Sequence, residues 1–135
     1  MKYSIDQLKA TDDSNIVQQD FILTTGLKGA TSLKLSLSIN IDTSEFIGTG
    51  TVFQATNPPL NLMSSVSGKY IPLLVMGAPQ PLFIGTGIQI STPLYENLDF
   101  SFQLNGDNNG RFKYRTSMDS DWITVENAHV EQVNN

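Results

Sequence analysis

Apolar and polar residues alternate along most of this chain, and helical periodicity is almost absent. The clearest stretch is LKLSLSINID at residues 33–42, in which Leu or Ile occupies every second position and polar residues lie between them. The segments LDFSFQL at 98–104 and RFKYRTSM at 111–118 repeat the pattern with aromatic residues. A period of two places one set of side chains on a buried face and the other in solvent. These segments therefore predict half-buried antiparallel strands.

Shorter apolar runs separated by turn residues predict further strands. These additional strands are expected at residues 21–25, 46–54, 60–66, 69–76, 82–90 and 122–125. A series of about eight or nine short strands is typical of an all-β sandwich or barrel. We predict one all-β domain over residues 1–135, folded as an antiparallel β-sandwich, with a partly closed antiparallel β-barrel as the alternative. Residues 1–15 and 127–135 show no clear strand pattern and are expected to be frayed ends or short helices.

The segments 98–104 and 111–118 are predicted to pair as a hairpin. Placing Phe102 opposite Phe112 also places Phe100 opposite Tyr114, which gives one aromatic face. A slip of one residue would break the alternation of both strands at once. The same register places Asp99 opposite Arg115.

The sequence FIGTG occurs twice, at residues 46–50 and 83–87. Similar residues follow both copies, so we predict two equivalent hairpins related by an approximate two-fold axis. A dinucleotide-binding loop needs a third glycine and a following helix, but Phe53 and Ile90 stand where that glycine belongs. We interpret the glycines as bare strand positions against which a ring or another backbone packs. A groove with a glycine floor that receives a ligand is the alternative.

Charged residues are unevenly distributed. They make up 16% of the chain, the net charge is −5, and Lys69 is the only charged residue from Phe46 to Tyr95. Because charge is depleted at the cores of interfaces, this span predicts contact with a neutral glycan or another protein, including a second copy in a homo-oligomer. The acidic balance opposes binding to phosphate backbones and predicts no nucleic-acid partner.

The single tryptophan, Trp122, follows Asp119 and Asp121. An indole face beside carboxylates suits the binding of a neutral sugar, although a lone Trp is more often a core anchor. The turn NGDNNG supplies further candidate ligand-binding residues, which are Asn105, Asp107 and Asn109. This turn resembles the start of a calcium-binding loop, but Thr116 stands where a bidentate Glu is needed, so we predict a hairpin turn and no metal site.

Arg111, Lys113 and Arg115 form a basic stripe along one predicted strand. The stripe is a candidate site for an acidic partner, and a solvated face is the more ordinary interpretation. Phe112 and Tyr114 point to the opposite face, so they cannot stack on a base that the cations also hold.

Catalytic residues are scarce. There is no cysteine, which excludes thiolate catalysis and thiolate metal sites, and the only histidine is His129 in the predicted frayed tail. We therefore predict that the protein is not an enzyme and holds no cofactor. An enzyme would need a cleft that contains His129 and a carboxylate.

The most apolar window, residues 71–84, is too short to span a bilayer and contains three prolines. The first residues include several charges and do not form the apolar run of a signal peptide. These features predict no membrane association and a cytoplasmic location, and they leave non-classical export open.

Three short motifs follow one another as GTG, NPPL and SSVSG at residues 48–50, 57–60 and 64–68. Their order resembles a family of small bacterial β-domains of unknown function, over roughly residues 20–115. The resemblance implies a compact β fold and a bacterial source. It implies no catalytic residues.

These observations predict a non-catalytic binding or assembly module. Its two versions are lectin-like recognition of a neutral glycan and self-assembly through the charge-poor span. The alternative is a β-barrel that carries a small apolar ligand in an interior lined by Phe100, Phe102, Phe112 and Tyr114.

Overall fold

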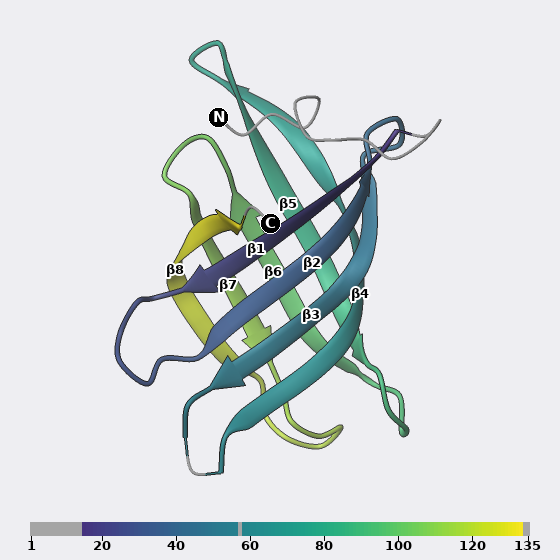
Figure 1. Ribbon diagram of the computed structural model, residues 1–135, viewed down its shortest axis with the longest axis vertical. Helices are drawn as coiled ribbons and strands as arrows, with labels where there is room; N and C mark the ends of the chain where they lie inside the picture. Colours follow the sequence, from purple (N-terminus) through teal and green to yellow (C-terminus); the bar gives the residue numbers. More distant parts are fainter. Residues whose placement is uncertain (1–14, 57, 134–135) are drawn as a thin grey trace.

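The computed structural model describes residues 15–56 and 58–133, which form a closed antiparallel β-barrel (Figure 1). Each strand pairs with the next along the chain, and β8 pairs with β1, where Val130 lies opposite Leu23. The strands are β1 (Ile16–Thr24), β2 (Ser32–Asn40), β3 (Glu45–Gln54), β4 (Leu60–Val75), β5 (Ala78–Gln89), β6 (Glu96–Gln103), β7 (Asn109–Tyr114) and β8 (Ile123–Val133).

The closed barrel corrects the predicted sandwich and confirms the alternative architecture. The strand that closes it is β8, of which the sequence predicts little more than the start. Residues 126–133 are mostly polar and place only two small or medium apolar side chains, Ala128 and Val130, in the core. Pairing with both β7 and β1 holds this segment as a strand instead of the predicted frayed end.

Inward side chains fill the barrel interior. Phe21, Phe83, Phe100, Phe102 and Phe112 are at most 1% exposed. Phe83 and Phe102 stack with ring centroids 4.8 Å apart, and Phe21 packs against both at 5.5 and 5.0 Å. An eight-stranded barrel is just wide enough to be filled in this way. The rings suggested as the lining of a ligand cavity therefore pack on one another.

The strand β4 runs without a break through Ser67 and Gly68, where the sequence predicts a turn between two strands. Gly68 is paired on both sides, with Phe46 of β3 and Gly85 of β5. A Cβ atom at Gly68 would lie 2.7 Å from the Phe46 ring. The glycine is therefore required for close packing and not for a turn.

The β4–β5 hairpin projects beyond one end of the barrel, at the top of Figure 1. Met76 and Gly77 form its two-residue turn, with φ of 53° and 81°, as expected for a type I′ turn. Met76 is 98% exposed, and Pro72 lies opposite Pro81 below the tip. We call this end of the barrel the hairpin end and the opposite end the loop end.

The β6–β7 register differs from the prediction by two residues. Phe100 lies opposite Phe112, and Phe102 lies opposite Gly110. A shift of two keeps every side chain on its predicted face, so alternation alone cannot detect it. Gly110 makes the observed register possible, because a Cβ there would lie 2.6 Å from the Cβ of Phe102.

The two FIGTG segments lie in β3 and β5, on either side of β4 and running in the same direction. Each pairs with the strand that follows it, but the registers differ, since Phe46 lies opposite Gly68 whereas Phe83 lies opposite Phe102, and the β5–β6 pairing shifts register between Gly87 and Ile88. Both copies therefore lie in antiparallel hairpins, as predicted, but the two hairpins are not equivalent in register. The second hairpin is displaced from the first by two strands around the barrel, and no two-fold axis relates them as predicted.

Candidate binding surface on the barrel wall

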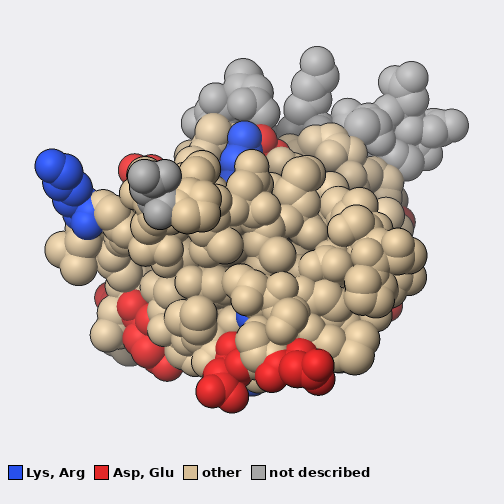
Figure 2. Space-filling view, turned by 90° about the horizontal axis from the view of Figure 1, so that it is seen from below, with Lys and Arg blue, Asp and Glu red and all other residues tan. Residues whose placement is uncertain are grey.

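The charge-poor span forms three adjacent strands. We name the outward-facing side chains of these strands the outer wall. They are Glu45, Ile47, Thr49, Thr51 and Phe53 of β3, Asn61, Met63, Ser65, Ser67, Lys69, Ile71 and Leu73 of β4, and Leu82, Ile84, Thr86 and Ile88 of β5. Figure 2 looks onto the loop end of the barrel, beside this wall, and shows charged groups mainly around the margin of that end.

Large aliphatic side chains are exposed on the outer wall. Ile47 is 65% exposed, Met63 50%, Ile88 48% and Ile84 40%. Single exposed apolar residues are normal on protein surfaces, but here several of them share three neighbouring strands that carry little charge, and charge is depleted at the cores of interfaces. Threonine and serine side chains lie between the aliphatic residues in the strand register.

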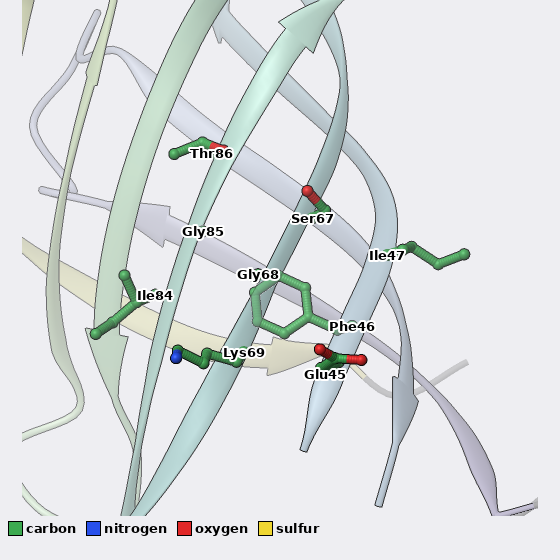
Figure 3. Close-up of a pocket in the computed structure, with 9 residues that line it drawn as sticks. All are labelled: Glu45, Phe46, Ile47, Ser67, Gly68, Lys69, Ile84, Gly85 and Thr86. Carbon is green, nitrogen blue, oxygen red and sulfur yellow. The ribbon is translucent and has the colours of Figure 1, made fainter. Parts of the chain in front are cut away.

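A shallow depression of about 580 Å³ lies in the middle of the outer wall (Figure 3). Its floor includes Gly68 and Gly85, which lie opposite each other. The other lining residues are Glu45, Phe46, Ile47, Ser67, Lys69, Ile84 and Thr86.

The depression follows from close packing beneath it. A Cβ at Gly68 would lie 2.1 Å from the Ile84 carbonyl oxygen, and a Cβ at Gly85 would lie 2.6 Å from the Phe100 ring. The strands thus curve tightly around the core rings, and outward side chains spread apart over a convex sheet. The packing interpretation is confirmed at Gly85, whose inner side meets the Phe100 ring, and a groove opens on the outer side. That this groove receives a ligand stays a prediction.

Two opposite charges lie side by side at the rim of this depression. Glu45 of β3 and Lys69 of β4 are Cα partners in the register. In the described part of the chain no ion pair joins the two side chains, because in Figure 3 Lys69 extends towards Ile84 while Glu45 points away from it. Within residues 15–56 and 58–133, the outer wall therefore carries one acid and one base that no ion pair joins.

The predicted ligand-binding residues divide between the two ends of the barrel. Asn105 and Asp107 lie in the β6–β7 turn and Asn109 begins β7, all at the hairpin end. Asp119, Asp121 and Trp122 lie in the β7–β8 loop at the loop end. The strand β7 separates the two groups, so they do not form one site.

Trp122 is partly exposed and lies outside the core. The Lys113 Nζ lies 5.0 Å from its ring centroid and the Arg115 guanidinium lies 4.7 Å from it. Arg115 also donates hydrogen bonds to the carbonyls of Glu96 at 2.8 Å and Met118 at 3.0 Å. Two of the three stripe residues thus hold the β7–β8 loop, and Lys113 takes the predicted place of Arg115 opposite Asp99.

The β6–β7 turn uses its amides to stabilise itself. Asn105 N donates to Asn108 Oδ1 at 2.9 Å, and both residues have positive φ. Asp107, Asn109 and Arg111 line a second depression of about 370 Å³ together with Glu126. The structure thus brings together two residues predicted to bind a ligand and one predicted to bind a partner.

His129 lies in β8, opposite Asn109 and Thr24, and its side chain is exposed. Over residues 15–56 and 58–133 no three His, Asp or Glu side chains come together as metal ligands. The same part of the chain has no helix that is long and apolar enough to cross a membrane.

The sequence alone did not identify the exposed aliphatic residues of the outer wall as a site. The signal that locates them is the absence of charge from Phe46 to Tyr95 combined with the alternation of each strand. No sequence pattern locates the depression, because its position depends on which strands lie beside Gly68 and Gly85.

Residues 16–122 match the model of the family described as Domain of unknown function (DUF1842), and the chain belongs to this family. The family match agrees with the resemblance to a domain of unknown function. It does not test the bacterial source. No curated protein matches the chain.

Proposed function

We propose that this protein is a non-catalytic binding module that contacts another protein through the outer wall. The observation that carries the proposal is the set of exposed aliphatic side chains on three strands that hold only Glu45 and Lys69 as charges; two of these side chains, Ile47 and Ile84, line the depression. Interfaces have cores that are depleted in charge and rims that are polar.

Burial of this surface would supply the binding energy. Removing apolar area from water contributes about 25 cal/mol per Å² before the entropy cost of association. Ile47 and Met63 present the most area, since each is at least half exposed. The neighbouring hydroxyls of Thr49 and Ser65 can form hydrogen bonds without the desolvation of a charge.

A photo-crosslinking amino acid at Ile84 tests the proposal directly. We expect a covalent adduct with another polypeptide, either in the purified protein or in a lysate of the source cells. The matched control places the same group at Thr124 on β8, where we expect none. If Ile84 gives no adduct in either setting, the outer wall does not bind protein and the proposal fails.

Recognition of a neutral glycan at the β7–β8 loop is the second candidate. It is supported by the partial exposure of Trp122 beside the exposed Asp119 and Asp121. A sugar would have to share the indole with Lys113 and Arg115, which already lie over the ring. A glycan array on which the wild type gives signal and Trp122→Ala does not would support this function, and a silent array would exclude it.

The carrier function receives less support. Phe100, Phe102, Phe112 and Tyr114 are buried, and neighbouring rings lie within 6.3 Å of one another. A ligand would have to displace these rings from a packed core. Native mass spectrometry of freshly purified protein would show a retained small molecule if the interior does carry one.

A further inference from the structure

We propose that the partner of the outer wall is a second copy of this chain, docked about a two-fold axis that runs between β3 and β4. This inference rests on the proposed function and adds the identity of the partner and the geometry of the contact. It follows from the placement of the two charges, from the strand register and from the shape of the wall.

The charges of the outer wall complement each other. Glu45 and Lys69 are adjacent Cα partners on β3 and β4. In a two-fold interface, any contact from one residue to another is repeated in reverse. The proposed axis lies in the plane of the interface and passes midway between Glu45 and Lys69, along the line between β3 and β4. Rotation by 180° about this axis places Glu45 over Lys69 of the second copy and Lys69 over its Glu45.

Other axes along the wall are disfavoured. An axis along β4 would place Lys69 on Lys69 of the second copy, and an axis along β3 would place Glu45 on Glu45. Each arrangement brings like charges together in a surface of low polarity. Only the axis between the two strands pairs both charges with opposite ones.

The same axis specifies the other contacts, because it bisects every β3–β4 pair in the register. Ile47 lies over Ser67 of the second copy, and Thr49 lies over its Ser65. Thr51 lies over Met63 of the second copy. These contacts combine aliphatic groups with hydroxyls and leave no buried charge without a partner.

The shape of the wall agrees with this register. Ile47 is the most exposed aliphatic side chain of the outer wall, and Ser67 lines the depression floored by Gly68 and Gly85. Docking about the proposed axis brings Ile47 of each copy to the depression of the other. A protruding side chain and the hollow that receives it therefore occur on the same surface at matching positions.

The wall is convex, so the contact is confined to β3, β4 and their neighbours. Interfaces of modest area bind weakly unless they are well complemented, and we expect a dissociation constant of about micromolar size. The dimer should therefore form and dissociate with concentration.

Charge reversal tests the proposal. Glu45→Lys and Lys69→Glu each place two like-charged pairs across the interface, and we expect each to weaken dimerisation about tenfold or more at low salt. An equimolar mixture of the two variants should form a mixed dimer of wild-type affinity, because every contact then pairs opposite charges. Sedimentation velocity measures all three dissociation constants.

The mixture also serves as the folding control, since a misfolded variant could not restore the dimer. Glu126→Lys on β8 is the matched control and should dimerise like the wild type. A wild type that keeps a mass of 14.8 kDa at high micromolar concentration would overturn the proposal. So would single variants that dimerise normally, or a mixture that stays monomeric.

These outcomes are separable from a failure of the proposed function. Crosslinking from Ile84 to a different polypeptide, with a monomeric wild type, would retain the outer wall as a binding surface and exclude the second copy. The absence of any adduct would exclude both.

Discussion

Two walls of one barrel differ in what they present to solvent. The β6–β8 wall carries Asp99, Arg111, Lys113, Glu126 and Glu131, whereas the outer wall of β3–β5 carries only Glu45 and Lys69. The inner faces of both walls are alike, since both pack apolar side chains into one core. The alternation that builds the barrel thus constrains only its inner face. The two walls can therefore differ in charge while they share one core, and the proposed partner contact falls on the wall that carries less charge.

The largest expected effect comes from the curvature that distinguishes the outer wall. Gly68→Ala adds a Cβ 2.1 Å from the Ile84 carbonyl oxygen and 2.6 Å from the Gly85 Cα. Because both are backbone atoms that cannot rotate away, we expect the free energy of unfolding to fall by about 3 kcal/mol. Urea titration followed by tryptophan fluorescence measures the loss. Ser67→Ala, one residue away on the outward face, should change it by less than about 0.5 kcal/mol, and equal losses would contradict the packing role of Gly68.

A smaller effect should separate the two walls in binding. Ile84→Asp places a charge in the apolar outer wall, and we expect the affinity for the partner to fall about tenfold or more while the stability of the barrel changes little. Thr124→Asp makes the corresponding change on β8 and should leave the affinity unchanged. Crosslinking yield and sedimentation velocity measure the affinity of each variant for the partner. Equal losses for the two variants would mean that net charge, and not the outer wall, controls association.

The β7–β8 loop should show a still smaller effect. Arg115→Ala removes two hydrogen bonds and the guanidinium over Trp122, which is 4.7 Å from the ring centroid. We expect a loss of about 1 kcal/mol of stability, because all of these contacts are partly exposed to solvent. The Trp122 emission should also move to longer wavelength. An unchanged emission maximum would show that Arg115 does not cover the indole in solution.

The inward and outward sets of side chains could be read from the sequence, because strict alternation leaves few choices. Leu33, Leu35, Leu37 and Ile39 are all buried as predicted. Most of the closing strand β8 could not be predicted from the sequence, since Ala128 and Val130 are its only buried apolar residues. The pairing with β1, which holds β8 as a strand, is not visible in the local sequence. Distant pairing therefore decides the difference between a sandwich and a barrel.

The sequence predicts the charge-poor span that carries the candidate site, but it predicts neither the side chains of that site nor its shape. The absence of charge marked the strands of the outer wall. The depression and the register of Glu45 with Lys69 depend on strand pairing and curvature, which alternation does not encode. Ser67-Gly68 looked like a turn because glycine often marks one, whereas here the missing side chain accommodates the Phe46 ring.

The prolines of the projecting hairpin limit how this protein can associate. The Tyr70 N–H points away from β5 and donates to the Ser44 carbonyl at 2.9 Å. Backbone groups alternate in direction along a strand, so those of Pro72 face the same side of β4 as those of Tyr70. Proline offers no N–H group there. On the other edge, the carbonyl of Pro81 accepts from Leu104 N at 3.1 Å and that of Pro79 accepts from Asn105 Nδ2 at 3.3 Å. An edge that lacks donors at these proline positions is a poorer template for strand addition. Growth into fibrils by edge-to-edge pairing is thereby disfavoured, which leaves the side chains of the outer wall as the surface through which the proposed closed pair would form.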